Sequence, residues 1–480
     1  MFLVTTANQS FWKLDEPILF LGNWCKVYSQ KHAWSELLGD VLPYHGLDRD
    51  ALYNDYKYAM DVYERNLVQL SKELNELHNL NHSLRYWRIV LGPWLSFFVG
   101  VLLDRYRSIC VAENSGKVTN TWITSEFPEG YLSNDFFEFR EKCLGDEYNH
   151  CLFSQVIKTS EKIPWEAKTT ENFLDFGSKE VPSSQKNSFK WSAIRWLGAF
   201  SKFFPDSLQK VVAVQSYIKP MDLMSLQLSM GMAPCPYRPE IKITPMQVNR
   251  EMRRKIKLDQ PENRFESILQ KCILSQIPKI YIEGYSSLAQ RALEAYPKKN
   301  RVILTSIAYK CDEGFKFWAA AQVDRGVKLA ITQHGGHVGD GRWSMDDDHE
   351  INIADRYFTW GWTRENENKT VPMPSSKLGS MATCIPDPNG SILCVTPSFP
   401  RYPGQMFSVP HGPLVLETYK FQEKFLQTVS PEVSEDLVFR LFQGYPGAIG
   451  WEERLRWNDS EVCPNIYQGK QPFFSRLEMS

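Results

Sequence analysis

The stretch VKLAITQHGGHVGDGRWSMDDDHEINIADRYFTWGW, residues 327–362, decides how this chain folds. It opens with a short apolar run, Val327–Thr332, of the kind that becomes a buried strand. A polar, glycine-rich turn follows, and it holds Gln333, His334, Gly335, Gly336 and His337. In an open parallel sheet, ligands bind outside the carboxyl ends of the strands. The turn is therefore the first candidate for a functional site.

Around this stretch the expected elements alternate between helix and strand, which is typical of a parallel sheet in an α/β fold. We expect helices at 265–272, 288–295 and 313–323, and strands at 279–282, 301–305, 327–332 and 356–362. Right-handed crossovers bring the carboxyl ends of such strands to one edge. Glu283, Ser306 and His334 are therefore expected to lie together there.

The N-terminal region is expected to add strands at 2–5 and 18–21 and a pair of helices. Between Leu52 and Leu80, apolar residues recur in steps of four and three, which indicates a seam along a helix. The next segment, Ile89–Leu103, is apolar but shorter than the ~20 residues that a membrane helix needs, so it predicts a buried helix. The pair is expected to form a helical hairpin inserted in the N-terminal domain, with a coiled-coil arm as the alternative.

The chain has 480 residues, which exceeds what one hydrophobic core usually serves, so two domains are expected. A polar stretch with four prolines, residues 366–390, indicates a linker between domains at 1–365 and 391–480. In the second domain we expect strands at 391–396 and 437–442 and a helix at 415–429. A sheet of this kind usually has about four to six strands, so the second domain is expected to be incomplete.

Composition argues against several classes of function. The formal net charge is −1, so no overall field favours nucleic acid or an anionic membrane. Ten cysteines without a CxxC pair predict free thiols, and no zinc-site spacing is present. The N-terminus lacks the features of a signal peptide, so a cytoplasmic protein is expected. Residues 190–204 mix lysines with aromatic residues, which leaves open both a membrane-surface helix and a core helix.

Five stretches carry a resemblance to a known family: FLGNWC at 20–25, RYWRIVLGPWL at 85–95, YIEGY at 281–285, the block from Phe315 to Trp343, and IADRYFTWGW at 353–362. On these stretches the chain resembles a bacterial transferase family associated with O-antigen and other surface-polysaccharide gene clusters. The resemblance implies a GT-B-like fold of two Rossmann-like domains, with an acceptor side and a donor side. It also implies that related chains continue further, so that this chain is expected to be truncated in its second domain.

Glycosyl transfer needs a base near the acceptor and groups that stabilise the leaving phosphate. Histidine titrates near neutrality, so His334 and His337 are candidates for the base, with Glu283 as an alternative. Glycines allow backbone amides to approach an anion, and arginines pair with phosphate. The binding candidates are Gln333, Gly335, Gly336, Arg342, Ser306, Ser398 and Arg401. A structural role stays open for both histidines and for Arg342, and no metal site is expected in the acidic run 346–348.

The resemblance implies transfer of a sugar from a nucleotide-activated donor to a surface-polysaccharide acceptor, either a glycan or a lipid-linked glycan. No separate cofactor and no nucleic-acid partner are expected. Transfer of a polyol phosphate or another activated group on the same fold is an alternative. A truncated, non-catalytic remnant or interaction protein, with the helix at 52–80 as a homodimer contact, is a further one. A peripheral contact with the inner membrane is also considered.

Overall fold

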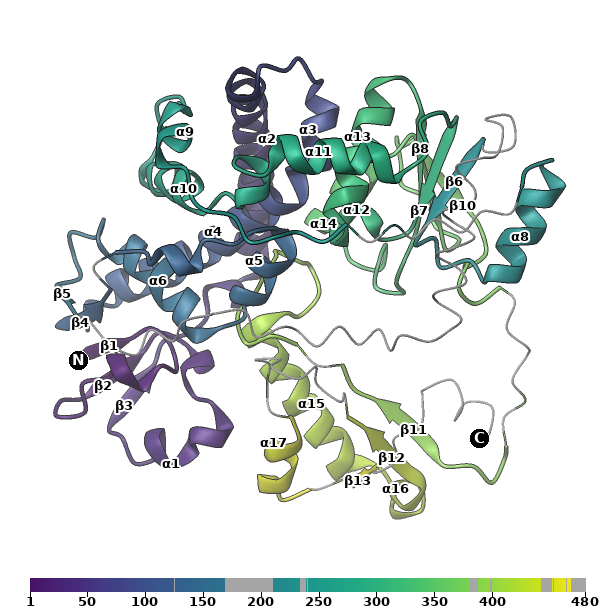
Figure 1. Ribbon diagram of the computed structural model, residues 1–480. Coiled ribbons are helices and arrows are strands. Elements are labelled where there is room, and N and C mark those ends of the chain that lie inside the picture. The colour runs from purple at the N-terminus through teal and green to yellow at the C-terminus, as the bar shows by residue number, and fades with distance from the viewer. Residues whose placement is uncertain are drawn as a thin grey trace.

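A computed structural model describes residues 1–124, 126–168, 210–233, 239, 241–379, 385, 387–397, 399–441, 451, 453–462 and 464–467. Three sheets organise this part of the chain, and every strand pair within them is parallel (Figure 1). The expected α/β class with parallel sheets is therefore confirmed. Residues 190–204 and Ser398 lie outside the described residues.

The first sheet has the order β3-β2-β1-β4-β5. Its strands are β1 (Phe2–Val4), β2 (Ile18–Phe20), β3 (Gly39–Val41), β4 (Asn120–Ile123) and β5 (Glu166–Ala167). The two strands expected at 2–5 and 18–21 are thus present and fully buried. The strand order reverses between β1 and β4, as it does at the ligand crevice of Rossmann-like sheets.

Long helices separate β3 from β4. They are α2 (Arg49–His78), α3 (Leu84–Val90) and α4 (Gly92–Ser115). The Asp48 side chain accepts hydrogen bonds from the first backbone amides of α2, and Asn79 ends the helix in a left-handed conformation. Because α2 packs against α4, the expected helical hairpin is confirmed. Pro93 lies in the first turn of α4, where its missing N–H costs no hydrogen bond.

The interior of α4 explains the apolar sequence there, since the segment from Gly92 to Arg105 is buried throughout. In the described ranges, no single helix has the length and apolar composition to cross a membrane. Helices α3 and α4 meet that test when they are taken together, but they are bent by 67° relative to each other. The prediction of a buried helix at 89–103 is confirmed.

The second sheet has the order β10-β9-β8-β7-β6. Its strands are β6 (Val211–Val214), β7 (Val302–Thr305), β8 (Lys328–Thr332), β9 (Arg356–Thr359) and β10 (Thr370–Pro372). The helices around it are α8 (Pro220–Ser229), α11 (Tyr285–Ala295), α12 (Ala308–Cys311), α13 (Glu313–Asp324) and α14 (Met345–Ile353). Helix α13 packs on α3 and α11, which joins this sheet to the helical hairpin.

Two details of this region differ from the sequence expectation. Residues 279–282 form no strand: Lys279–Tyr281 is a 3₁₀ turn, η8. Pro278 precedes it, and the amides of Lys279 and Ile280 donate to Ser133 and Asn134 carbonyls at 3.0 and 2.9 Å. A short buried apolar run cannot by itself distinguish a strand from a buried turn. The stretch expected as a linker, 366–390, contains β10, so the sheet continues past residue 365.

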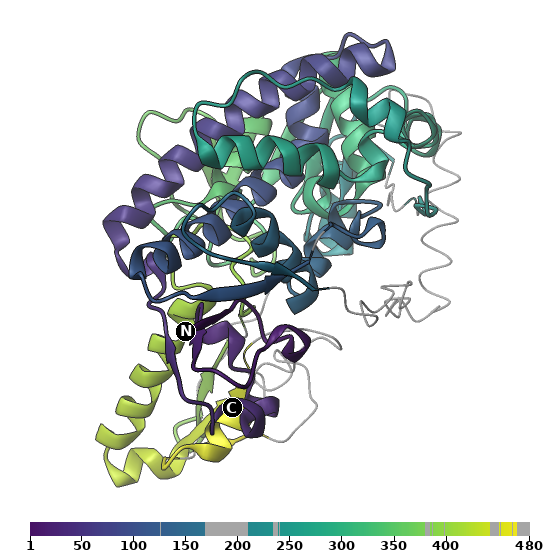
Figure 2. The same cartoon turned by 90° about the vertical axis from the view of Figure 1, so that its left-hand side faces the viewer.

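The third sheet has the order β11-β12-β13 and a small core of its own. It consists of β11 (Ile392–Val395), β12 (Leu437–Arg440) and β13 (Asn465–Ile466), with α15 (Val415–Thr428), α16 (Pro431–Asp436) and α17 (Glu453–Asp459). The strands expected at 391–396 and 437–442 and the helix at 415–429 are confirmed. This unit lies beside the first sheet (Figure 2), where α17 contacts the 3₁₀ turn η3 (Tyr28–Gln30).

The remaining helices pack beside the first sheet and the hairpin. They are α1 (Lys31–Trp34), α5 (Phe136–Lys142), α6 (Asp146–Ile157), α9 (Arg250–Lys255) and α10 (Arg264–Gln276), the last of which contacts α4 and α6. Helix α6 contacts both β4 and α4. One continuous core of buried residues runs from β1 through the hairpin to β8 and α15, so these elements share one interior.

Candidate functional site

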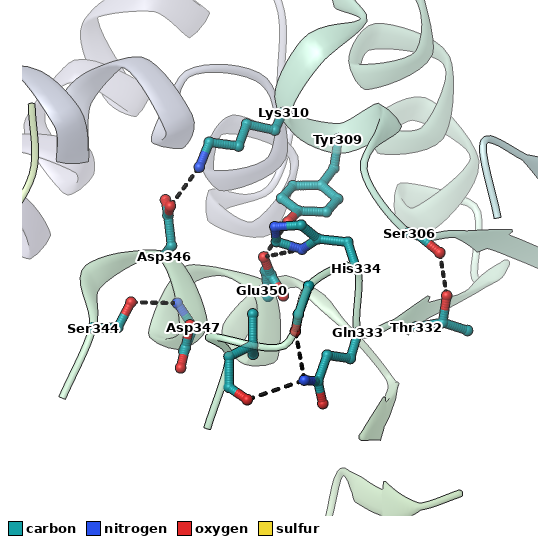
Figure 3. A network of polar contacts seen from close by, with 12 residues as sticks. Ser306, Tyr309, Lys310, Thr332, Gln333, His334, Ser344, Asp346, Asp347 and Glu350 are labelled. Atoms are coloured by element: carbon teal, nitrogen blue, oxygen red, sulfur yellow. Dashed lines mark hydrogen bonds and ion pairs between the residues drawn. The ribbon is translucent and has the colours of Figure 1, made fainter. Parts of the chain in front are cut away.

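The carboxyl ends of β7 and β8 lie side by side, as the sequence predicted for Ser306 and His334. Ser306 is fully buried, and its hydroxyl donates to the Ser216 carbonyl at 2.7 Å and contacts the Thr332 hydroxyl (Figure 3). These contacts hold the ends of the central strands together. Ser306 therefore stabilises the edge of the sheet from which the turn that begins at Gln333 extends.

Gln333 fixes the turn that follows β8. Its side-chain amide donates to the carbonyls of Gly335 and Val338, at 2.7 and 3.0 Å. Its side-chain oxygen accepts from the Trp360 backbone N–H at 2.7 Å and from the Trp362 indole at 2.8 Å. All four hydrogen-bonding positions of the amide are thus used within the protein. Gln333 sets the path of the glycine-rich turn rather than presenting a free group.

His334 extends from this turn toward a buried carboxylate. Its Nδ1 lies 3.4 Å from Glu350 Oε1, and the histidine side chain is 14% exposed against 1% for the glutamate (Figure 3). Glu350 also accepts hydrogen bonds from the Tyr357 hydroxyl at 2.5 Å and from the Tyr309 hydroxyl. Burial next to this carboxylate raises the pKa of both tyrosines, so they stay protonated donors. The 3.4 Å approach is not a hydrogen bond, because His334 Nδ1 has no hydrogen-bond partner among the described residues. A histidine close to a buried carboxylate is nevertheless an arrangement found in many general bases.

His337 is the second histidine of the turn. Its ring centroid lies 5.5 Å from that of His334, in an edge-to-face arrangement. Partial desolvation, together with His334, lowers the pKa of His337 below its usual range. A Cβ on Gly335 would lie 2.9 Å from the His337 ring, so glycine allows the two residues to approach closely. The two histidines therefore lie side by side on the same turn.

The acidic run forms the first turn of α14, as expected of a helix N-terminus, where negative charge is favoured. Asp346 is bound by the Lys310 ammonium and by Gln405, whose Nε2 donates at 2.5 Å. Burial alone would raise the pKa of Asp346, but Lys310 outweighs it and the pKa is lowered. Asp348 pairs with Arg364 at 2.6 Å.

Asp347 is buried, and its pKa is raised to about 6 by that burial and by Glu350. Its carboxylate accepts from the Gly339 backbone N–H at 3.2 Å, which ties the glycine-rich loop to α14. Among the described residues, no group of three or more His, Cys, Asp or Glu side chains is arranged to hold a metal ion.

Other residues named from the sequence lie elsewhere. The expectation that Glu283 shares the edge with Ser306 and His334 is wrong, because it follows a 3₁₀ turn and pairs with Arg253 at 2.7 Å. Arg401 is buried against the first sheet, where it pairs with Asp146 at 2.6 Å.

The surroundings of Arg342 and Gly336 are more open. Arg342 is exposed and stacks over the Tyr53 ring at 4.9 Å. A Cβ added to Gly336 would have only Trp360 near it, at 3.9 Å. Both residues therefore lie where a ligand could reach them, although Arg342 is not directed at His334 by any contact of its own.

Sequence reasoning missed four contributors to this cluster. Tyr309 and Lys310 lie just beyond the carboxyl end of β7, so the argument applied to Ser306 could have included them. Glu350 follows the acidic run in the same helix, at the spacing that turns it toward the sheet. Gln405 comes from the segment between β11 and α15, and no local pattern marks it.

The whole chain, residues 1–480, matches the model of a protein family described as the LIC12162 family of transferases. The chain belongs to this family. The expected transferase class is thereby confirmed. No curated protein and no solved structure matches the chain. In this LIC12162 family transferase, the cluster around His334 and Glu350 brings a histidine, a buried carboxylate and a glycine-rich turn together at one sheet edge.

Proposed function

We propose that this transferase moves a sugar from a nucleotide-activated donor to a surface-polysaccharide acceptor of the O-antigen type. The observation that carries the proposal is the position of His334, which lies beyond the carboxyl end of β8 with Nδ1 3.4 Å from the buried Glu350. The family supports group transfer, and the fold supports a ligand at this edge.

The reaction assigns one role to each residue of the cluster. His334 accepts the proton of the acceptor hydroxyl while the hydroxyl oxygen bonds to the anomeric carbon of the donor sugar. The bond from that carbon to the donor phosphate breaks, and its electron pair leaves with the phosphate. Glu350 stabilises the protonated imidazole, and the amides of Gly335 and Gly336 approach the developing anion. His337 contacts the acceptor beside His334.

The proposal includes a GT-B-like arrangement of two Rossmann-like domains in a cytoplasmic protein that works on a glycan or lipid-linked glycan. The order β3-β2-β1-β4-β5 of the first sheet supports the Rossmann-like part. The third sheet, β11-β12-β13, is the corresponding donor-side unit. No cofactor besides the donor takes part.

A two-stage experiment tests this function. The purified protein is first melted with UDP-, GDP-, CDP- and CMP-linked sugars, because a ligand that binds the folded state raises the melting temperature. The stabilising donor is then used in a transfer assay on surface glycans. His334→Ala is expected to lower kcat by about 10²–10⁴, the range for losing a general base. The control is His32→Ala, an exposed histidine of α1.

The outcome separates the hypotheses clearly. If the His334→Ala protein melts normally and transfers sugar at the wild-type rate, His334 is not the general base. If polyol-phosphate donors stabilise the protein and no nucleotide-sugar does, the proposed donor is wrong and the related phosphate chemistry replaces it.

A further inference from the structure

A pocket lies beyond the carboxyl end of β2, and none of its lining residues belongs to the His334 cluster. Its walls come from the segment after β2, from Arg401, from the start of α15 and from α17, and its volume is ≈110 Å³. About 10–15 Å³ admits one water molecule, so there is room for a group of several heavy atoms. The position matches the edge at which open parallel sheets bind ligands.

The lining is cationic although the chain as a whole is not. Lys26, Arg401 and Arg456 line the pocket, while the chain has a formal net charge of −1. Arg401 is compensated by Asp146 at 2.6 Å. Within the part of the chain that the structure describes, Lys26 and Arg456 have no carboxylate within 4.0 Å. The nearby Asp459 pairs with Lys31 instead, so neither positive charge has a carboxylate counterion among the described residues.

Arg401 supplies independent evidence that a ligand belongs here. Its side chain is 2% exposed, and its Nε has no hydrogen-bond partner among the described residues. A buried donor that stays unpaired costs free energy, and a bound water, ion or ligand at the pocket would remove that cost. Burial also lowers the pKa of Lys26, whose ammonium lies over the rings of Phe20 and Trp34.

The chemistry of the walls selects the kind of anion. Two guanidinium groups can each form two parallel hydrogen bonds to a phosphate, and a lysine adds a compact charge. Aromatic side chains complete the pocket: Tyr28, Trp34 and Trp451. Flat rings next to cations suit a phosphoryl group that is joined to a heteroaromatic base.

We propose that this pocket binds the phosphoryl group of a nucleotide through Lys26, Arg401 and Arg456. None of its lining residues belongs to the turn at Gly335 and Gly336, so this site is separate from the one assigned to the leaving phosphate of the donor and does not rest on the proposed function. Lys26 and Arg456 were not among the residues that the sequence indicated. Free pyrophosphate carries the same anionic group without the base, so it serves as the probe that separates the pocket from the nucleotide.

Calorimetric titration of the full chain tests the inference with UDP, CDP, GDP, CMP and pyrophosphate as probes. Lys26→Gln and Arg456→Gln are each expected to weaken binding about tenfold, because each removes one charge-assisted contact. Arg456→Lys keeps the charge and loses the planar fork, so an intermediate loss is expected. The matched control is Lys328→Gln, an exposed lysine at the amino end of β8. Thermal melts establish that each variant is folded.

Each result decides a different part. Nucleotide binding that weakens in both glutamine variants and not in Lys328→Gln supports the whole inference. Pyrophosphate binding with the same pattern, without any nucleotide binding, supports the phosphoryl pocket and counts against a nucleotide as its ligand. Equal nucleotide affinity in all variants would show that the nucleotide does not bind in this pocket, and it would leave the proposed function unaffected. If a folded wild-type chain binds none of the probes, the inference is overturned.

Discussion

Gln405 donates a hydrogen bond of 2.5 Å to Asp346, and thereby ties the segment before α15 to the first turn of α14. The same segment forms an isolated bridge through Phe407 to Ser344, just before that helix. Shortly before Gln405 in the sequence, Arg401 pairs with Asp146 beside the first sheet. One short segment therefore contacts both the His334 cluster and the phosphoryl pocket.

The first prediction concerns this connection. Gln405→Ala removes a hydrogen bond to a charged group, so we expect the free energy of unfolding to fall by about 1.5–3 kcal/mol. Urea denaturation measures the change. Gln290→Ala is the matched control, since that glutamine is exposed and bonds to Glu294 on the same helix, at 2.9 Å. Equal losses in the two variants would show that Gln405 has no special role.

The second prediction concerns pH. The pKa of Asp347 is raised to about 6 in the folded state, so the folded protein binds a proton more tightly than the unfolded chain does. This difference disfavours folding above pH 6, and the penalty disappears as the pH falls toward 4. Asp347→Asn is therefore expected to stabilise the protein at pH 7.5, by up to about 3 kcal/mol, and to have no effect near pH 4.

Denaturation curves at several pH values measure this difference. Asp340→Asn serves as the control because Asp340 is an exposed carboxylate in the adjacent loop. A stabilisation by Asp347→Asn that is the same at every pH would contradict the assigned cause, which is burial next to Glu350.

The third prediction compares two glycines of the turn. Gly339 has a φ of +85°, and a Cβ there would lie 2.3 Å from the Trp362 ring, whereas a Cβ on Gly336 meets nothing closer than 3.9 Å. Gly339→Ala is expected to destabilise the protein by about 1–3 kcal/mol, through the backbone conformation and the clash. Gly336→Ala is expected to leave stability nearly unchanged while it weakens donor binding.

Thermal melts and donor titrations on the same two variants check that separation. A large loss of stability in Gly336→Ala would mean that the turn is packed more tightly than its open surroundings indicate. Unchanged donor binding in a stable Gly336→Ala protein would remove the anion-binding role of its amide.

Much of the fold was predictable from the sequence because its signals are local. The apolar run at 327–332 became β8, the seam at 52–80 became α2, and the apolar segment after it became α4. The failures arose where a local pattern has two solutions. The run at 279–282 is as apolar as a strand, yet it is buried as a 3₁₀ turn against the loop that precedes α5.

Within the candidate site, only the position of His334 was predictable from the sequence. His334 follows from the rule that ligands meet the carboxyl ends of parallel strands. Its partner Glu350 depends on how α14 rotates over the sheet, and Gln405 depends on how a segment 59 residues beyond Asp346 returns to it. The sequence predicts Arg401 as a phosphate ligand in the second domain. In the structure it contacts Asp146 and Trp24, which lie beside the first sheet. Contacts between segments that are distant in the chain produce no periodic pattern in the sequence.

The fourth prediction follows from His349, which lies one residue before Glu350 and close to Gly92, where an added Cβ would be 2.8 Å from the His349 ring. Burial lowers its pKa to about 3, and neither ring nitrogen has a hydrogen-bond partner among the described residues. The unfolded chain takes up a proton below about pH 6.5, and the folded protein does not do so until near pH 3. The contribution of His349 to the free energy of unfolding is therefore constant above pH 6.5. It falls on acidification below that pH, with a slope of about 1.4 kcal/mol per pH unit.

His349→Gln removes that titration, so its stability relative to wild type is expected to rise steadily as the pH falls from 6.5 to 4, and to be unchanged above pH 7. The sign is opposite to that of Asp347, whose burial disfavours folding at high pH. A wild-type profile alone shows only the sum of the two contributions, whereas the two variants measured at the same pH values resolve them. If His32→Gln, at an exposed histidine, produced the same rise as His349→Gln, general charge effects rather than burial would explain the acid sensitivity.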